Sequence, residues 1–192
     1  MKKKLKVSFN APVTLSFVLI SLVVTILGIV SRGKITETMF MTYHSSLLNP
    51  MTYIRFFTHV LGHSGWTHYI GNITYLLLLG PMLEEKYGSK TIIEIMAITA
   101  FATGLINYLF FWNSGLCGAS GVVFAFIILA SFTNFKEGEI PLSFILVFVL
   151  FIGQQVFEGI TIRDNVSQIS HIIGGVIGGG LGYTLNKKSK FW

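Results

Sequence analysis

The sequence predicts an all-α membrane protein, a bundle of six transmembrane helices with a long first outer loop. Of its 192 residues, 52% are hydrophobic and 11% are charged, against roughly 25% charged in a soluble domain. The apolar residues form separate stretches of about the length that a roughly 30 Å hydrocarbon layer requires. Polar or charged segments separate these stretches, so residues 1–192 are expected to form one integral membrane domain.

The first expected span covers residues 11–30 and follows a basic N-terminus. Its lysines are Lys2, Lys3, Lys4 and Lys6. A secretory signal peptide would share these features, but the apolar run is longer than a typical signal core. We therefore expect a helix that remains in the membrane.

Five further apolar spans are expected, at about residues 68–83, 91–112, 120–133, 141–157 and 168–185. The segment 31–67 is too long for a simple connection and is rich in Phe, Tyr, Met and His. We predict an outer loop that lies partly in the membrane interface. The alternative, a mobile solvated loop, would be expected to be more polar.

The basic residues indicate the orientation. Six spans put both termini on one side, and the side richer in Lys and Arg is cytoplasmic. That side would hold ten basic residues: Lys2, Lys3, Lys4, Lys6, Lys86, Lys90, Lys136, Lys187, Lys188 and Lys190. The other would hold four: Arg32, Lys34, Arg55 and Arg163. We therefore predict a multi-pass protein of the cell membrane with cytoplasmic termini.

The net charge of +6 comes from clusters beside the spans. These clusters favour the lipid bilayer as the partner and argue against nucleic acid. Cys117 is the only cysteine, so an intramolecular disulfide and a cysteine-based metal cage are excluded. No cofactor is expected.

Ser120 opens a span too short to cross the hydrocarbon layer. From Ser120 to residue 134 is 14 residues, about 21 Å of helix. Residues 113–118 must then dip into the membrane as irregular backbone, which is tolerated only where protein or water surrounds it. Counted the same way from residue 185, His171 reaches the same depth. His68 and Asn72 bracket that depth on the second span.

A stripe of small residues would bring the fourth and sixth spans together. Gly174, Gly178 and Gly182 follow His171 at three- and four-residue spacing, and Gly121 and Ala125 are four apart after Ser120. Such stripes let helix backbones approach closely. Packing these two faces together would place His171 beside Ser120.

These residues suggest nucleophilic catalysis. His171 could take the proton of Ser120, and no acidic residue is near, because the single aspartate, Asp164, is in an outer loop. We therefore expect a Ser-His dyad. The amide of Ser120 at the helix start, with the side chains of His68 and Asn72, could form an oxyanion hole.

Each feature also has a simpler explanation. Ser120 could be an N-cap, the glycine stripe could serve helix association, and His68 with Asn72 could join helices by hydrogen bonds. Four such groups at one depth favour catalysis. His59 and His63 have helical i, i+4 spacing, but no cysteine or carboxylate completes a metal site. We expect them to lie in loop and to hold its fold by hydrogen bonding.

The sequence resembles the rhomboid intramembrane serine proteases over residues 55–182. The matching motifs are "HVLGHSGWTHYIGN", which ends in His68 and Asn72, "GASG" around Ser120, and "SHIIGGVIGG" with His171. The GASG motif contributes Gly118 and Gly121. The resemblance implies a six-helix fold and a serine endopeptidase that cuts transmembrane protein substrates near the outer membrane boundary. It also implies that the fifth span and the following loop form the gate for substrate.

The resemblance implies further roles. Glu84, in "EEKYGS", would tether the cytoplasmic ends of helices. Arg55 matches the arginine of a Trp-Arg pair in the first loop, with Ile54 in place of the tryptophan. Phe124 matches an aromatic residue that stacks on the catalytic histidine. Two alternatives remain, a catalytically silent relative that binds membrane helices and a small transporter with a broken fourth helix.

Overall fold

The computed structural model describes residues 7–132, 139–161 and 165–188. The side chains at 155, 158–161, 165–167 and 186–188 lie outside this description. Several residues on which the predicted topology and the predicted dyad without a carboxylate depend also lie outside it. They are Lys2, Lys3, Lys4, Lys6, Lys136, Arg163, Asp164 and Lys190, with the side chains of Lys187 and Lys188.

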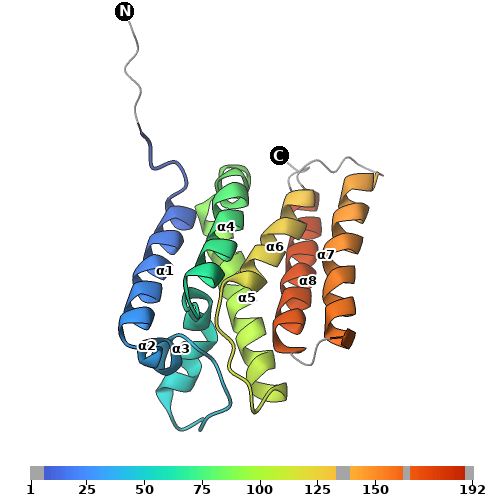
Figure 1. Ribbon diagram of the computed structural model, residues 1–192. Helices are drawn as coiled ribbons and strands as arrows, with labels where there is room; N and C mark the ends of the chain where they lie inside the picture. The colour runs from blue at the N-terminus through green and yellow to red at the C-terminus, as the bar shows by residue number, and fades with distance from the viewer. Residues whose placement is uncertain (1–6, 133–138, 162–164, 189–192) are drawn as a thin grey trace, which may run out of the picture.

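Within the described ranges, all regular elements are helical. They are α1 (Pro12–Val30), α2 (Lys34–Met39), α3 (Pro50–Thr58), the 3₁₀ turn η1 (His59–Leu61), α4 (Trp66–Tyr87), α5 (Ser89–Phe110), α6 (Ser120–Ser131), α7 (Leu142–Thr161) and α8 (Asn165–Lys188). The long helices run side by side, with α1 and α7 at opposite edges of the bundle (Figure 1). The start of α1 and the end of α8 lie at the same end.

The all-helical class is confirmed, and the six longest described helices lie on the six predicted spans. Their ends differ by up to four residues, because α4, α7 and α8 continue beyond their apolar parts, whereas α5 and α6 end two residues before the predicted limit. α1 and α5 are long and apolar enough to cross a membrane, whereas Ser120–Ser131 and Leu142–Gln154 are shorter apolar helices. The number of spans stays a prediction.

The predicted outer loop is partly helical. It contains α2, α3 and η1, so His59 lies in a 3₁₀ turn where loop was expected. The start of α3 follows from local sequence, because Asn49 Oδ1 accepts a hydrogen bond from the Met51 amide at 3.0 Å. Pro50 then occupies the first turn, where its missing N–H costs nothing.

Glu84 joins three helices at one end of the bundle. One carboxylate oxygen accepts hydrogen bonds from the Val13 amide at 2.9 Å and from Ser89 Oγ at 2.7 Å. The other accepts from the Thr14 amide at 3.0 Å and Thr14 Oγ1 at 2.9 Å. The carboxylate thereby satisfies two amides in the first turn of α1, which have no partner within that helix.

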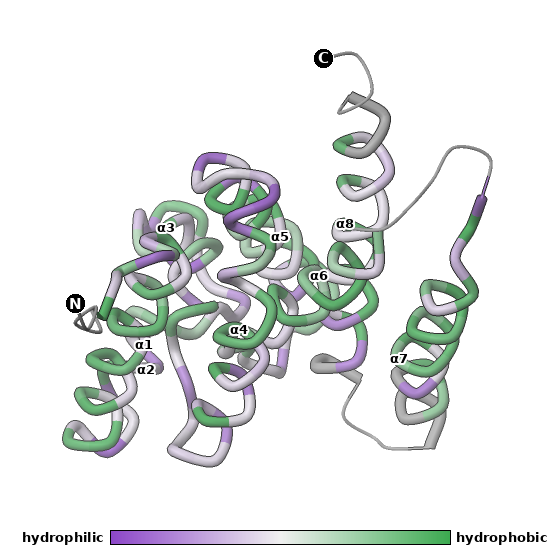
Figure 2. The backbone as a smooth tube through the Cα atoms, turned by 90° about the horizontal axis from the view of Figure 1, so that it is seen from above, coloured by the Kyte–Doolittle hydropathy of each residue, from purple (hydrophilic) through white to green (hydrophobic). Residues whose placement is uncertain are grey.

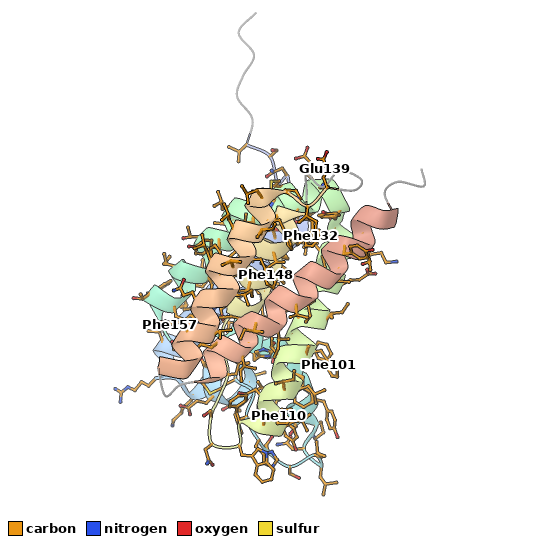
Figure 3. All side chains as sticks on the ribbon, turned by 90° about the vertical axis from the view of Figure 1, so that its right-hand side faces the viewer. Phe101, Phe110, Phe132, Glu139, Phe148 and Phe157 are labelled. Carbon is orange, nitrogen blue, oxygen red and sulfur yellow. The ribbon has the colours of Figure 1, made fainter. Side chains whose placement is uncertain are left out.

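The helix α6 is the centre of the bundle. Every residue from Gly121 to Leu129 is buried, and hydrophobic residues run along its length (Figure 2). By contrast, α7 lies at the edge, and side chains such as Phe148 and Phe157 project from its outer face (Figure 3). Phe157 is 67% exposed, as suits a surface in contact with lipid.

The glycines of α8 meet α6 as the sequence predicts. A Cβ at Gly174 would lie 2.8 Å from the carbonyl carbon of Gly121 and nearer still to its oxygen. A Cβ at Gly178 would lie 2.8 Å from the Cα of Ala125. The residue numbers of the contacting positions increase together along the two helices, so α6 and α8 run parallel and in contact.

We expect Gly178→Ala to destabilise the fold, because the new methyl group would collide with the backbone of Ala125. Overpacking of this kind costs about 1–3 kcal/mol. Gly180→Ala is the matched control, since nothing lies within 4 Å of a Cβ there and alanine improves helix propensity by up to about 1 kcal/mol. The midpoint of thermal unfolding in detergent should therefore fall for Gly178→Ala and rise for Gly180→Ala. Shifts of the same sign and size would contradict the packing.

Candidate active site

Ser120 is the first residue of α6, and its hydroxyl does not cap the helix. The N-cap position belongs to Ala119, and no side chain caps there. The first helical hydrogen bond runs from the Val123 amide to the Ala119 carbonyl at 2.9 Å. The amides of Ser120, Gly121 and Val122 therefore precede it and point out of the helix start. This excludes the N-cap explanation for the serine.

His171 lies on α8 against the first turn of α6. Its ring stacks on Phe124, with centroids 4.3 Å apart and planes 3° apart. Phe124 is one helical turn after Ser120, and a Cβ at Gly121 would lie 3.4 Å from the carbonyl oxygen of Ser170. Ser120 and His171 thus border the same contact between helices.

The segment before Ser120 meets the wall formed by α4. Gly118 has φ +123°, a conformation that side chains rarely adopt. A Cβ there would lie 2.6 Å from Nε2 of His68 and 3.6 Å from Nδ2 of Asn72. The two predicted donors therefore converge on the backbone two residues before Ser120. Asn72 is 7% exposed, and its Nδ2 has no partner within the described chain.

Ser64 sets the tautomer of His68. Its amide is 3.5 Å and its hydroxyl 3.1 Å from Nδ1 of His68. An amide can only donate, so Nδ1 accepts, and a neutral imidazole must then carry its proton on Nε2. That nitrogen is the one that faces Gly118, so His68 presents a donor toward the start of α6.

The irregular segment 113–118 turns back from the end of α5 into the bundle before α6 begins (Figure 1). The outer loop pairs with its backbone. Thr42 and Leu116 exchange two hydrogen bonds at 2.9 and 2.8 Å, and the Gly118 amide donates to the His59 carbonyl at 2.9 Å. The irregular backbone predicted before Ser120 is therefore present and is supported by residues of the outer loop, and its depth in a membrane stays a prediction.

His59 holds the outer loop against α5, and Arg55 joins two parts of that loop. His59 Nδ1 donates to the Arg55 carbonyl at 3.0 Å, and Nε2 lies 3.2 Å from Thr103 Oγ1. Burial lowers the pKa of His59 to about 4, so the ring is neutral. Arg55 is buried, donates from Nε to the Thr38 carbonyl at 2.8 Å, and its guanidinium lies 4.4 Å from the centre of the Tyr43 ring. Tyr43 thus contacts this arginine, while Ile54 is 47% exposed.

Asn107 is a residue of this region that the sequence analysis missed. Its Nδ2 donates to the carbonyls of Thr42 at 3.1 Å and Ser114 at 3.3 Å. One side chain therefore bonds both the outer loop and the irregular segment. The signal that could have identified it is an asparagine inside the apolar third span, where a polar side chain needs a hydrogen-bond partner.

Comparison with known proteins agrees with the motifs. The family model of the rhomboid domain matches residues 50–188. Rhomboid-related protein 1 of Caenorhabditis elegans is 33% identical over 141 residues, 68% of this chain and 39% of that protein. Rhomboid-related protein 2 of Mus musculus is 29% identical over 175 residues, 76% of this chain and 58% of that protein.

A bacterial protein is also similar. Rhomboid protease GlpG of Haemophilus influenzae is 25% identical over 141 residues, 70% of this chain and 72% of that protein. The chain spans less than two thirds of the length of the two animal relatives.

We expect Asn107→Leu to loosen the segment before Ser120, because it removes two hydrogen bonds of about 1 kcal/mol each. Cys117, the only cysteine, lies in this segment and is half-buried. Its rate of alkylation by a maleimide should rise by roughly tenfold. Asn113→Leu, at an exposed asparagine of the same segment, should leave the rate unchanged. Equal rates in wild type and Asn107→Leu would contradict the role of the amide.

Proposed function

From the membership of this chain in the rhomboid family, which the match over residues 50–188 establishes, we propose that it is an intramembrane serine endopeptidase. Its substrates are transmembrane segments of membrane proteins, cut near the outer membrane boundary. The observation that carries the proposal is the contact of α6 with α8, in which His171 stacks on Phe124 one turn after Ser120. A general base beside a serine at a helix start is the arrangement that acyl transfer requires.

In the proposed mechanism, His171 takes the proton of Ser120 as its oxygen attacks the scissile carbonyl. The negative charge that develops on the carbonyl oxygen is stabilised by the Ser120 amide, His68 Nε2–H and Asn72 Nδ2–H. Collapse expels the amine, which receives the proton from His171, and leaves an ester on Ser120. Water, deprotonated by His171, then hydrolyses this ester.

The proposed topology has six spans, cytoplasmic termini and a site open to the outer side of the cell membrane. Rhomboid-family proteins are membrane-embedded, and the start of α1 and the end of α8 at one end of the bundle support an even number of spans. Substrate would enter beside α7. Phe151 of that helix packs edge-on against Phe124, with centroids 5.9 Å apart, so a shift of α7 would uncover the Phe124–His171 pair.

We expect a fluorophosphonate probe to label the wild-type protein in detergent, because the probe reacts only with an activated serine. Ser120→Ala and His171→Ala should both abolish labelling and cleavage of a transmembrane substrate. Ser131→Ala, at the other end of α6, is the matched serine control and should label like the wild type. A folded wild-type protein without labelling would instead favour a catalytically silent protein that binds membrane helices.

We expect Asn72→Ala to slow cleavage without abolishing it. Loss of one oxyanion donor typically costs about 10²- to 10³-fold in turnover. The variant should stay folded, because the Nδ2 of Asn72 has no hydrogen bond to lose within the described chain. Turnover equal to wild type would remove Asn72 from the oxyanion hole.

A further inference from the structure

A cavity of about 350 Å³ lies where α1 meets the outer loop. Four segments line it. The end of α1 provides Gly28 and Ile29, the following turn and α2 provide Arg32 and Glu37, the chain after α2 provides Met41, and the loop before α4 provides His63 and Ser64. Small-molecule sites range from about 300 to 1,000 Å³. The volume is at the low end of that range, which suits a compact group better than an extended molecule.

His63 is the unusual group in this cavity. Its side chain is 2% exposed. The Leu61 backbone lies close enough to the ring to act on its pKa, but neither ring nitrogen has a partner in good hydrogen-bond geometry within the described chain. Its ring meets His68 and Tyr69 edge-on, with centroids 5.1 and 5.4 Å apart. Buried polar groups are normally hydrogen-bonded. The cavity therefore contains an imidazole that can still form a hydrogen bond to a molecule that enters it.

The protonation state of His63 defines what it can bind. Burial, aided by the nearby His68, lowers the pKa of His63 to about 4. The ring is then neutral at pH 7, with one nitrogen as donor and the other as acceptor.

The cavity also has two charges of opposite sign. The side chains of Arg32 and Glu37 are exposed at its rim. The salt bridge found among described residues joins Lys90 and Glu94, so Arg32 and Glu37 pair neither with each other nor with another described residue. A simple anion would be repelled by Glu37 and a simple cation by Arg32. The complementary ligand is a zwitterion.

The surroundings favour a lipid over a soluble zwitterion. Ile29 lines the cavity and is 43% exposed. The exposed apolar side chains of Val23, Ile26 and Val30 belong to the same helix end. A headgroup in the cavity could therefore continue into acyl chains along α1.

We propose that this cavity binds the headgroup of a phosphatidylethanolamine. Arg32 and His63 would contact the phosphate, and Glu37 would contact the ammonium. A choline headgroup fits less well, because its quaternary ammonium donates no hydrogen bond and is normally held by aromatic rings. No Phe, Tyr or Trp belongs to the lining.

The test is lipid titration of the full chain in detergent, followed by native mass spectrometry. Phosphatidylethanolamine should bind at one saturable site, more tightly than phosphatidylcholine or phosphatidylglycerol with the same acyl chains. Glu37→Gln and Arg32→Gln should each weaken binding by roughly tenfold, the loss expected for one charge-assisted contact. The matched controls are Glu85→Gln and Lys34→Gln, at exposed residues that do not line the cavity. These two changes should leave lipid binding unchanged.

Three outcomes would overturn the proposal. Equal affinity for the three lipids would exclude recognition of the headgroup. Unchanged binding in both Glu37→Gln and Arg32→Gln would place the lipid elsewhere. Binding of glycerophosphoethanolamine, which lacks acyl chains, as tightly as the lipid would identify a soluble zwitterion instead. The measurement does not depend on proteolysis, so failure here and failure of the proposed function are distinguishable.

Discussion

The close approach of α6 and α8 is the constraint on which the candidate site depends. In lipid, helices gain nothing from burying apolar surface against each other and associate through packing and hydrogen bonds instead. Gly174 and Gly178 let the backbone of α6 occupy the space where side chains would stand. This contact fixes the level of His171 relative to the start of α6. A wider separation of the helices would carry His171 away from both Phe124 and Ser120.

A second constraint comes from the short length of α6. A helix that begins inside the bundle needs an irregular segment to reach it, and unpaired backbone groups in hydrocarbon cost several kcal/mol each. The outer loop provides the partners through Thr42 and the His59 carbonyl. Its own fold is fixed in turn by Arg55 and by the bonds of His59 to α5. The outer loop is therefore part of the framework of the site, and a mobile solvated segment could not have this role.

What the sequence predicted correctly was local or periodic. The six long helices follow from apolar run length, the start of α6 from the glycines around Ser120, and the contact with α8 from the spacing of Gly174 and Gly178. α3 was missed although Asn49 and Pro50 are a recognisable helix start. The pairing of Thr42 with Leu116 could not be predicted, because it joins residues far apart in sequence through backbone atoms. The contact of Asn107 with Thr42 could not be predicted for the same reason, because it also joins residues far apart in sequence.

The proposed dyad must orient its histidine without the carboxylate of a triad, which normally fixes the ring and stabilises its charged form. Part of that task falls to packing. Stacking at 3° on Phe124 fixes the plane of the His171 ring, and the rigid contact of α8 with α6 fixes its position. The planar face of an aromatic ring also attracts a cation, so in the proposed mechanism Phe124 would stabilise His171 when it holds the proton of Ser120. An aliphatic residue at position 124 would remove both effects while keeping the apolar character of α6.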